Sequence, residues 1–365
     1  MATLTQFRPG EIWPDDHGVH INAHGGGILV HQGIFYWFGE HKVEGKLGNS
    51  AQVGVHVYSS RDLYNWRDEG IALRVEDSPD SDITRGCVLE RPKVIYNART
   101  SKFVMWFHLE LKGRGYSASR SGVAISDHVT GPYQFIRSLR PNAGILPMNE
   151  ASRSVDPLNE AESARMASKR WSEGRSDFPV DLIFRRDFPG GQMARDMTLF
   201  VDDDSTAYHV FASEENATLN IAELSEDYTT HTGRYFRVFP REFNEAPALF
   251  KHSGRYYMFS SDCTGWAPNP GRVAVADSIW GPWTHLGNPC RGEPEQTATT
   301  FESQSTHVLP IPGPVPGQLG KFIYMGDRWR PDNAIDGRYI WLPIEWENDA
   351  PVIRWHDHWD MRVLA

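Results

Sequence analysis

The sequence predicts an all-β protein folded as a five-bladed β-propeller. Short apolar runs joined by tight turns recur five times in the same order, and each of these hairpins is followed by further β-rich residues. The composition agrees, because 32 Gly and 24 Pro suit short strands and turns, and 12% aromatic residues can fill the space between stacked sheets. A large β-sandwich would show similar alternation, but it does not require units that recur in register.

The clearest unit is the fourth one. It opens with a carboxylate, Glu245, directly before an apolar run at 248–250. A Gly-containing turn, Lys251 to Gly254, leads into a second apolar and aromatic run at 256–259, which predicts a β-hairpin. An antiparallel pairing places the start of the first strand and the end of the second at the same edge of the sheet.

The other units follow the same layout, with a polar or small residue before each hairpin. Each unit consists of an opening residue and two apolar runs, which we expect to be the two strands of a hairpin. The first unit opens at Ala23-His24 and has runs at 28–30 and 34–38; the second opens at Glu90, with runs at 94–96 and 103–107; the third opens at Asp196, with runs at 199–201 and 207–211. The fourth opens at Glu245, with runs at 248–250 and 256–259, and the fifth opens at Gln304, with runs at 308–309 and 322–325. A unit of this size cannot bury both faces of its sheet alone, so neighbouring units must stack. We assign Trp37, Trp106 and Tyr257, which lie in the middle of strands, to the core between blades.

Residues 141–190 interrupt the pattern between the second and third units. This stretch is polar and charged, and it favours a helix around 161–171. We expect one propeller domain over residues 1–365 that carries this stretch as a surface insertion. The insertion either shapes the substrate site as a rim or lid, or is a solvated decoration.

The charge balance argues against nucleic acid and anionic membranes as partners, because the net charge is −10. The three cysteines, Cys87, Cys263 and Cys290, are widely spaced and odd in number, which indicates reduced thiols. The first 13 residues lack the apolar core of a secretion signal, and no later run is long enough to span a membrane. These observations predict a cytoplasmic protein, or a secreted one whose leader has been removed.

The residues that open the units indicate the chemistry. In a propeller the innermost strands surround the central axis, so Glu90, Asp196, Glu245 and Gln304 should converge on one pocket. Carboxylates gathered in a small volume shift one another's pKa values, and stability alone does not explain such a cluster. Hydrolysis of a glycosidic bond needs an acid of raised pKa, a group that activates water and a third charge that tunes the acid. Each residue taken alone would more simply cap a strand.

Several strings together resemble glycoside hydrolase family 43, a family of inverting five-bladed propellers, and the resemblance covers nearly the whole chain. The order of Arg195-Asp196-Met197 and Glu245-Ala246-Pro247 is typical of that family. Further strings resemble its exo-β-1,3-galactanase-like branch: Ala23-His24-Gly25-Gly26-Gly27, Glu90-Arg91-Pro92-Lys93-Val94, residues 263–269 (CTGWAPN) and Ser303-Gln304-Ser305-Thr306. The resemblance implies that Glu245 is the general acid and that Asp196 tunes its pKa and orients it.

The identity of the base stays open. Most of the family has an aspartate at the start of the first blade, where this chain has Ala23-His24. The galactanase-like branch shares that gap, and the resemblance implies that Gln304 positions or deprotonates the water, with Glu90 nearby. An amide is a very poor base, so Glu90 is the more ordinary candidate, provided that it lies roughly 6.5–9.5 Å from the acid. The flanking Arg91 and Arg195 could hold these acids ionised.

Sugar-binding residues are expected at the ends of the second strands and in the loops that follow them. The candidates for hydrogen bonds to ring hydroxyls are Glu40, Glu214, Glu215, Asn216, Thr264 and Asp327, and those for stacking on a sugar face are Trp266 and Tyr116. Each of them could equally serve a turn or the packing.

The sequence assigns no metal ligand and requires no cofactor. Some relatives in the family place calcium on the axis near a histidine, which His24 or His307 could provide, although a buried core histidine is the commoner case. The Asp202-Asp203-Asp204 run lacks the downstream residues of a calcium loop and is expected to be a hairpin turn.

The resemblance therefore implies an inverting exo-glycosidase that releases terminal galactose from β-1,3-galactan or arabinogalactan-type oligo- and polysaccharides. An α-L-arabinofuranosidase or a β-galactofuranosidase is the alternative within the family. A non-catalytic carbohydrate-binding propeller is the alternative outside the enzymes, but such a protein has no need of a tuned acid such as Glu245 beside Asp196.

Overall fold

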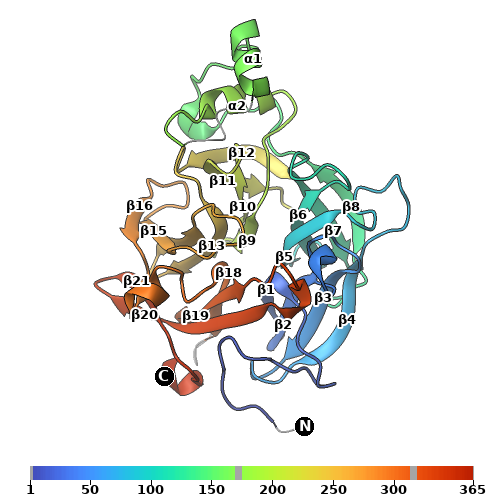
Figure 1. Ribbon diagram of the computed structural model, residues 1–365, viewed down its shortest axis with the longest axis vertical. Helices are drawn as coiled ribbons and strands as arrows, with labels where there is room; N and C mark the ends of the chain where they lie inside the picture. The colour runs from blue at the N-terminus through green and yellow to red at the C-terminus, as the bar shows by residue number, and fades with distance from the viewer. Residues whose placement is uncertain (1–2, 169–174, 313–318, 365) are drawn as a thin grey trace.

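The computed structural model describes residues 3–168, 175–312 and 319–364. It contains five β-sheets arranged around a central axis, so the predicted five-bladed β-propeller is confirmed (Figure 1). The innermost strands form a closed ring, since β1 neighbours both β5 and β18, and β9 and β13 complete the circle. This ring excludes a β-sandwich.

Each of the first four blades is a four-stranded antiparallel meander. Blade one consists of β1 (His24–His31), β2 (Ile34–His41), β3 (Gly54–Ser60) and β4 (Arg67–Arg74), and blade two of β5 (Val88–Asn97), β6 (Lys102–Glu110), β7 (Arg120–Ser126) and β8 (Gln134–Leu139). Blade three consists of β9 (Met197–Val201), β10 (Ala207–Ser213), β11 (Thr218–Leu224) and β12 (His231–Val238). Blade four consists of β13 (Glu245–His252), β14 (Arg255–Ser261), β15 (Arg272–Ala276) and β16 (Thr284–Gly287).

The fifth blade has one strand more than the others. Its meander is β18 (Gln304–Pro312), β19 (Leu319–Arg328), β20 (Arg338–Glu347) and β21 (Ala350–Arg354), and β17 (Cys290–Arg291) pairs in parallel with β21 at the outer edge. Short helices occupy connections: η1 (Lys46–Asn49), η2 (Met148–Glu150), α1 (Glu160–Ser168), α2 (Val180–Asp187), α3 (Pro294–Thr297), η4 (Ala334–Asp336) and η5 (Met361–Leu364). None of the described helices is both long and apolar enough to cross a membrane.

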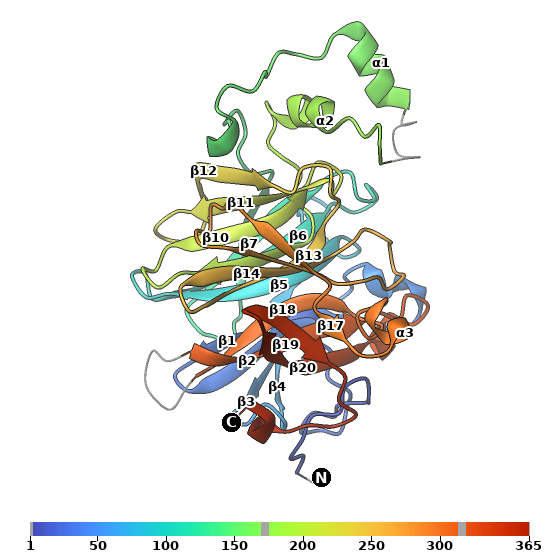
Figure 2. The same ribbon diagram turned by 90° about the vertical axis from the view of Figure 1, so that its left-hand side faces the viewer.

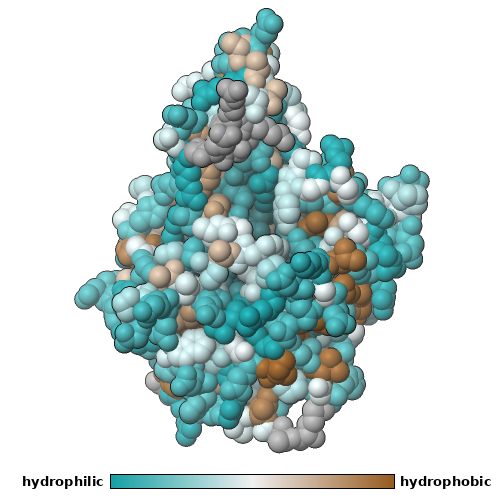
Figure 3. Space-filling view, in the orientation of Figure 1, coloured by the Kyte–Doolittle hydropathy of each residue, from teal (hydrophilic) through white to brown (hydrophobic). Residues whose placement is uncertain are grey.

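The hydrophobic core lies between the blades. Successive side chains of a strand point to opposite faces, so Trp37 packs toward blade five while Phe38 packs toward blade two. Trp37, Trp106 and Tyr257 are 1%, 0% and 2% exposed, which confirms their assignment to the core. The outer surface is mostly hydrophilic in the view of Figure 3, as expected when apolar side chains fill the spaces between sheets. Cys87, Cys263 and Cys290 are free thiols.

Four inner strands bend within their first few residues. The register of the first hairpin shifts after His24 in β1, after Glu90 in β5 and after Glu245 in β13, and β18 shifts after Ser305. Such β-bulges turn the start of a strand and re-aim its side chains.

The residues that follow the first three of these positions have left-handed backbone: Gly25, Arg91 and Ala246 have φ of 61°, 56° and 54°. At Gly25 the space also requires glycine, because a Cβ there would lie 2.2 Å from Glu40 Oε1. The sequence shows the polar residues but not the bend that directs them into the pocket.

The insertion lies between blades two and three, and its helices α1 and α2 project beyond β12 (Figure 2). The predicted helical stretch 161–171 is helical up to Ser168, and its last three residues lie outside the described part of the chain. Ile183 of α2 belongs to an apolar cluster that also contains Ala217 and Phe243 of the propeller. The insertion therefore packs against the loops before β11 and β13.

Candidate active site

A pocket of about 400 Å³ opens at the starts of the inner strands, and all five blades contribute to its wall. It is lined by Glu40, Lys42, Asn49, Glu90, Arg91, His108, Tyr116, Arg195, Asp196, Asn216, Glu245, Gly265, Trp266, Gln304 and Trp329. The four residues that the sequence analysis assigned to catalysis thus lie in one pocket, as the convergence of the strand starts required.

Glu245 has the properties of a general acid. It is the first residue of β13, and Asn216 Nδ2 donates a hydrogen bond of 2.6 Å to its Oε1. Burial raises the pKa of Glu245 to about 7, and the charge of Asp196 adds to this rise, while Arg91 opposes it. A carboxyl group with that pKa is partly protonated near neutral pH, so it can donate a proton to a leaving oxygen.

Asp196 is tied to the backbone beside Glu245. Its Oδ2 accepts a hydrogen bond of 3.1 Å from the backbone N–H of Ala246 and lies 3.0 Å from a guanidinium nitrogen of Arg91. Arg91 is buried, and its other terminal nitrogen donates to the backbone oxygen of Ser305 at 2.8 Å. Arg91 therefore connects the starts of β5, β9 and β18 around the acid.

The amide of Gln304 is saturated with partners. Its Oε1 accepts from Arg91 at 2.6 Å and from the indole of Trp329 at 2.9 Å. Its Nε2 donates to Ser261 Oγ at 2.9 Å and lies 3.5 Å from Glu245 Oε2. Two acceptor and two donor contacts use the full capacity of an amide.

The side chains of Gln304 and Glu245 are therefore in direct contact. The contact with Glu245 is the longest of the four, so a sugar ring between the two residues would displace it first.

Glu90 is held by a chain of hydrogen bonds. His108 Nδ1 donates to Glu90 at 2.9 Å, its Nε2 donates to the fully buried Glu110 at 3.0 Å, and the Tyr116 hydroxyl donates to Glu90 at 2.7 Å. Although burial opposes ionisation, the bond and the charge of His108 lower the pKa of Glu90 to about 2. The two carboxylates in turn raise the pKa of His108 to about 9 despite its burial. Glu90 is thus a charged carboxylate with unused lone pairs.

Four predicted sugar-binding residues line the pocket. Glu40 and Asn216 face it as hydrogen-bonding groups, and Tyr116 and Trp266 face it as aromatic ones. Glu40 also pairs with Lys42 at 2.5 Å, and burial raises the pKa of Glu40 although Lys42 opposes this rise. Trp266 is 44% exposed, which leaves area for stacking.

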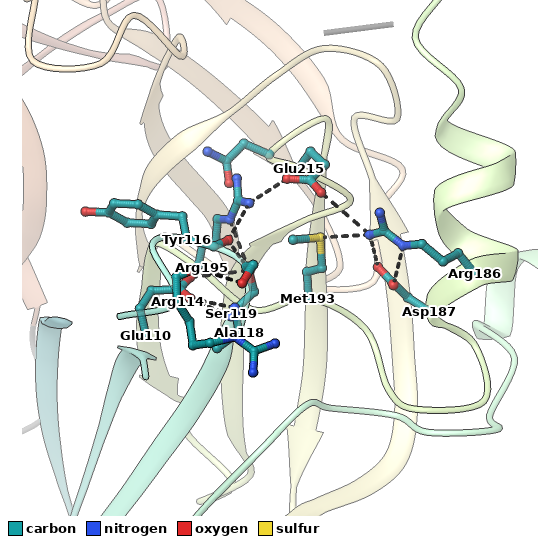
Figure 4. Close-up of polar contacts among 12 residues, drawn as sticks. Glu110, Arg114, Tyr116, Ala118, Ser119, Arg186, Asp187, Met193, Arg195 and Glu215 are labelled. Atoms are coloured by element: carbon teal, nitrogen blue, oxygen red, sulfur yellow. Dashed lines mark hydrogen bonds and ion pairs between the residues drawn. The ribbon is translucent and has the colours of Figure 1, made fainter. Parts of the chain in front are cut away.

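Glu214 and Glu215 do not line the pocket, which corrects their assignment. Glu214 is fully buried, and Arg237 binds both of its carboxylate oxygens at 2.7 Å. Glu215 lies between Arg195, at 2.5 Å, and Arg186 of α2, at 3.6 Å (Figure 4). Only the third residue of this turn, Asn216, reaches Glu245.

Thr264 and Asp327 are also absent from the pocket wall. The Thr264 hydroxyl donates to the backbone oxygen of Ala267 at 2.6 Å and accepts from Asn269, so it shapes the loop that carries Trp266. Asp327 accepts a hydrogen bond of 2.7 Å from the backbone N–H of Gly25 and thereby fixes the bulge of β1.

A second hollow of about 330 Å³ adjoins the pocket. The two share Gly265, Trp266, Gln304 and Trp329, and Asp327 lines only the second one. The rings of Trp266 and Trp329 meet edge to face, with centroids 5.8 Å apart, at the boundary between them. A ligand that extends beyond the pocket would pass over this pair.

Sequence reasoning did not select Lys42, Asn49, His108 or Trp329, all of which line the pocket. Two of them carry a signal in hindsight. His108 pairs with Glu90 in the register of the β5–β6 hairpin, and Trp329 directly follows the end of β19. Lys42 and Asn49 lie in the connection between β2 and β3, where no pattern marks them.

The described residues do not fit a calcium ion on the axis. An axial cavity of about 260 Å³ is lined by Lys93, Asp203, Lys251 and His307 among mostly apolar residues. The buried amino group of Lys93 donates to the backbone oxygens of Gly25 at 2.9 Å and Arg91 at 3.4 Å, which are the type of ligand that calcium prefers. Calcium there would have to displace this amino group from both oxygens.

Two other places are equally unsuited to a metal ion. In the pocket both ring nitrogens of His108 donate to carboxylates, so His108 has no lone pair left for a metal. In the 202–204 turn Lys251 binds Asp202 at 2.6 Å and Asp203 at 2.8 Å. That run forms the hairpin turn before β10.

The family model described as glycosyl hydrolases family 43 matches residues 169–302. Among solved structures, a family 43 β-1,3-galactosidase with galactodeoxynojirimycin is 50% identical, with a TM-score of 0.88 over 97% of this chain and 100% of that chain. An exo-β-1,3-galactanase from Phanerochaete chrysosporium with β-1,3-galactotriose is 32% identical, with a TM-score of 0.75 over 97% of this chain and 68% of that chain. An exo-β-1,3-galactanase from Clostridium thermocellum is 31% identical, with a TM-score of 0.77 over 97% and 66% of the two chains. No curated protein matches the sequence significantly.

Proposed function

Since the chain belongs to the glycosyl hydrolases of family 43, we propose that it is an inverting exo-enzyme that releases terminal galactose from β-1,3-galactan and arabinogalactan-type glycans. The observation that carries this proposal is the buried Glu245 with a pKa of about 7 in a pocket whose wall comes from all five blades. The similarity to β-1,3-galactosidases over nearly the whole chain supports galactose over an arabinofuranosyl or galactofuranosyl group.

In this proposal the terminal galactose enters the pocket end-on, because all five blades contribute to the pocket wall. Glu245 protonates the oxygen that links the terminal sugar to the rest of the glycan. The charge of Asp196 raises the pKa of Glu245 and so favours its protonated form, and Asp196 also accepts a hydrogen bond from the backbone of Ala246 beside it. Bond cleavage then leaves a sugar ring with oxocarbenium character, which the negative charge of Glu90 stabilises.

Water attacks from the face opposite Glu245 and inverts the anomeric carbon. We propose that Gln304 orients this water through Nε2, which becomes free when the sugar displaces the 3.5 Å contact with Glu245. Its Oε1 stays bound to Arg91 and Trp329, so it has no lone pair left for the proton of the water. In this proposal the proton passes to Glu90, a carboxylate of the pocket wall whose two hydrogen bonds leave lone pairs unused.

The proposal includes an oligo- or polysaccharide as the partner and no metal ion in the reaction. A pocket that gathers several carboxylates in a protein of net charge −10 repels nucleic acid and anionic lipid surfaces. A non-catalytic lectin is not favoured, because a carboxyl held near pKa 7 costs free energy that sugar binding alone does not need.

The test is hydrolysis of β-1,3-galactotriose followed by proton NMR, with the Glu245→Gln variant as the control. The expected first product is α-galactose, together with galactobiose. Release of β-galactose would contradict inversion, and release of internal fragments would contradict exo action. Hydrolysis of an arabinofuranoside but not of galactotriose would assign the enzyme to the other sugar.

A further inference from the structure

The turn between β10 and β11 has an unusual backbone and holds the general acid. Glu214, Glu215 and Asn216 have φ of 53°, 57° and 68°, so three consecutive non-glycine residues are left-handed. This conformation is unfavourable for residues with a Cβ, and it persists only where surrounding contacts enforce it. The last residue of the turn, Asn216, donates the 2.6 Å hydrogen bond to Glu245.

Backbone contacts connect the turn to the segment that leads into β13. The N–H of Asn244, the residue before Glu245, donates to the backbone oxygen of Asn216 at 3.1 Å. The insertion packs against the residue after the turn and against the segment before β13, since its apolar cluster includes Ala217 and Phe243. A displacement of the turn would therefore move Asn216 relative to Glu245.

The first charged contact between the insertion and the turn passes through Arg237 of β12. Arg237 is buried and binds both carboxylate oxygens of Glu214 at 2.7 Å. On its other side it donates to both oxygens of Glu150 of the insertion at 2.5 Å. The ring of Phe184 in α2 lies 5.2 Å from the same guanidinium. Two insertion residues thus enclose the cation that holds Glu214.

The second contact is made by Arg186 of α2, which lies 3.6 Å from Glu215. Asp187 binds the same guanidinium at 2.7 and 2.8 Å and sets its direction, and Figure 4 shows Glu215 between Arg186 and the pocket residue Arg195. Both carboxylates of the turn are therefore neutralised by arginines, and the insertion takes part in each pair.

We propose that Glu150 and Arg186 are positioning residues, which hold the left-handed turn 214–216 and thereby fix Asn216 against the general acid Glu245. This inference rests on the proposed function, because it assigns the insertion a part in the same reaction. In this proposal the described part of the insertion supports the pocket from behind, which differs from both expected roles, a rim or lid over the site and a solvated decoration.

The experiment compares Glu150→Gln, Arg186→Gln and the double variant with the control Arg185→Gln. Arg185 is the neighbouring arginine of α2, but it pairs with Glu162 of α1 at 2.7 Å and does not contact the turn. The readout is kcat/KM against pH with β-1,3-galactobiose, measured alongside a nitrophenyl β-galactoside. The charges of Asp196, Arg91, Arg195 and Arg175 and the hydrogen bond of Cys263, which all act on Glu245, are unchanged in every variant.

For the double variant, we expect the plateau value of kcat/KM on galactobiose to fall about three- to tenfold. We also expect the pH at which kcat/KM declines on the basic side of the profile to rise by roughly half to one unit. The direction follows because the hydrogen bond from Asn216 favours the charged form of Glu245, so its loss raises the pKa. The KM for the nitrophenyl substrate should stay within about twofold, since neither substituted residue lines the pocket. Arg185→Gln should leave the profile of the wild type.

A double-mutant cycle with Asn216→Ala locates the effect. If the insertion acts through Asn216, the Glu150 and Arg186 substitutions cause no further shift in the Asn216→Ala background. An equal shift in both backgrounds, an unmoved limb, or the same shift in Arg185→Gln would overturn the proposal.

A crystal structure of the double variant provides a test that does not depend on hydrolysis. If the wild type hydrolyses no galactoside, the proposed function fails, but the separation of Asn216 Nδ2 and Glu245 Oε1 still decides this inference. A separation that remains near 2.6 Å would overturn it, and one beyond hydrogen-bond distance would support it.

Discussion

Asp196→Asn is expected to move the pH profile downward by a predictable amount. The pKa of Glu245 rises from 4.5 to about 7, with burial as the larger cause and the charge of Asp196 as the next. Less than half of this rise, about one pH unit, is therefore assigned to Asp196, which corresponds to about 1.4 kcal/mol. The asparagine keeps the acceptor for the backbone N–H of Ala246 but removes the charge, and it leaves Arg91 without a carboxylate partner at this position. Both changes favour ionised Glu245, so its pKa should fall to about 6.

The assay is kcat/KM for β-1,3-galactobiose between pH 4.5 and 8, because this parameter reports the pKa values of the free enzyme. With a pKa near 7, the protonated fraction of Glu245 falls about twofold between pH 5 and pH 7; with a pKa near 6 it falls about tenfold. The ratio of kcat/KM at the two pH values should therefore grow about fivefold in the variant. Asp202→Asn, at the far end of β9, is the matched control, since Asp202 binds Lys251 and Tyr256 outside the pocket. A basic limb that stays at the wild-type position or rises in Asp196→Asn would refute the assignment.

Four further outcomes are expected. Glu245→Gln should lose about 10²–10⁴-fold in turnover of galactobiose, because it removes the transferable proton, and much less with a nitrophenyl leaving group; equal losses would assign Glu245 to binding. Glu90→Gln and Gln304→Ala should both be severely impaired, but azide should restore only Glu90→Gln, giving the α-galactosyl azide, since azide needs no proton acceptor; rescue of only Gln304→Ala would make Gln304 the acceptor. Trp266→Ala should raise the KM for galactotriose by about two- to tenfold with kcat nearly unchanged, whereas a fall in kcat at constant KM would contradict a stacking role. A chelator should leave turnover of galactotriose unchanged, and a loss that calcium reverses would contradict the reading of the axial cavity.

The fold could be predicted because its signal repeats. Each unit buries its strands against the next unit, so the apolar runs recur in register, and β13 and β18 begin at the predicted residues Glu245 and Gln304. The clustering of the acids followed from the same geometry, since equivalent strand starts surround one axis. The fifth strand of blade five was not predicted, because β17 consists only of Cys290 and Arg291.

The fine structure of the site could not be read in the same way. Glu214, Glu215 and Asn216 are three similar polar residues in a row, yet a left-handed turn sends one into a buried ion pair, one toward the insertion and one to the acid. His108 lies within an apolar strand, and its protonation depends on two carboxylates, Glu90 and Glu110, that only the fold brings to it. Three of the four contacts of Gln304 come from other blades, and the fourth comes from Trp329, which follows the second strand of its own hairpin. None of these contacts repeats at a regular spacing along the chain, so no sequence pattern predicts them.

The repeated bulge separates the residues that face the pocket from the residues that pack between the blades. The strand beyond the bend packs between blades, while the residue before it faces the pocket, as Glu245 does ahead of the buried Ala248 and Leu249. A new side chain at an opening position therefore changes the reaction without disturbing the packing that holds the ring closed. His24 occupies an opening position without joining the pocket wall, and the chain still folds around it. The other four opening positions, Glu90, Asp196, Glu245 and Gln304, line the cavity and determine its chemistry, while the strands behind them hold the ring closed.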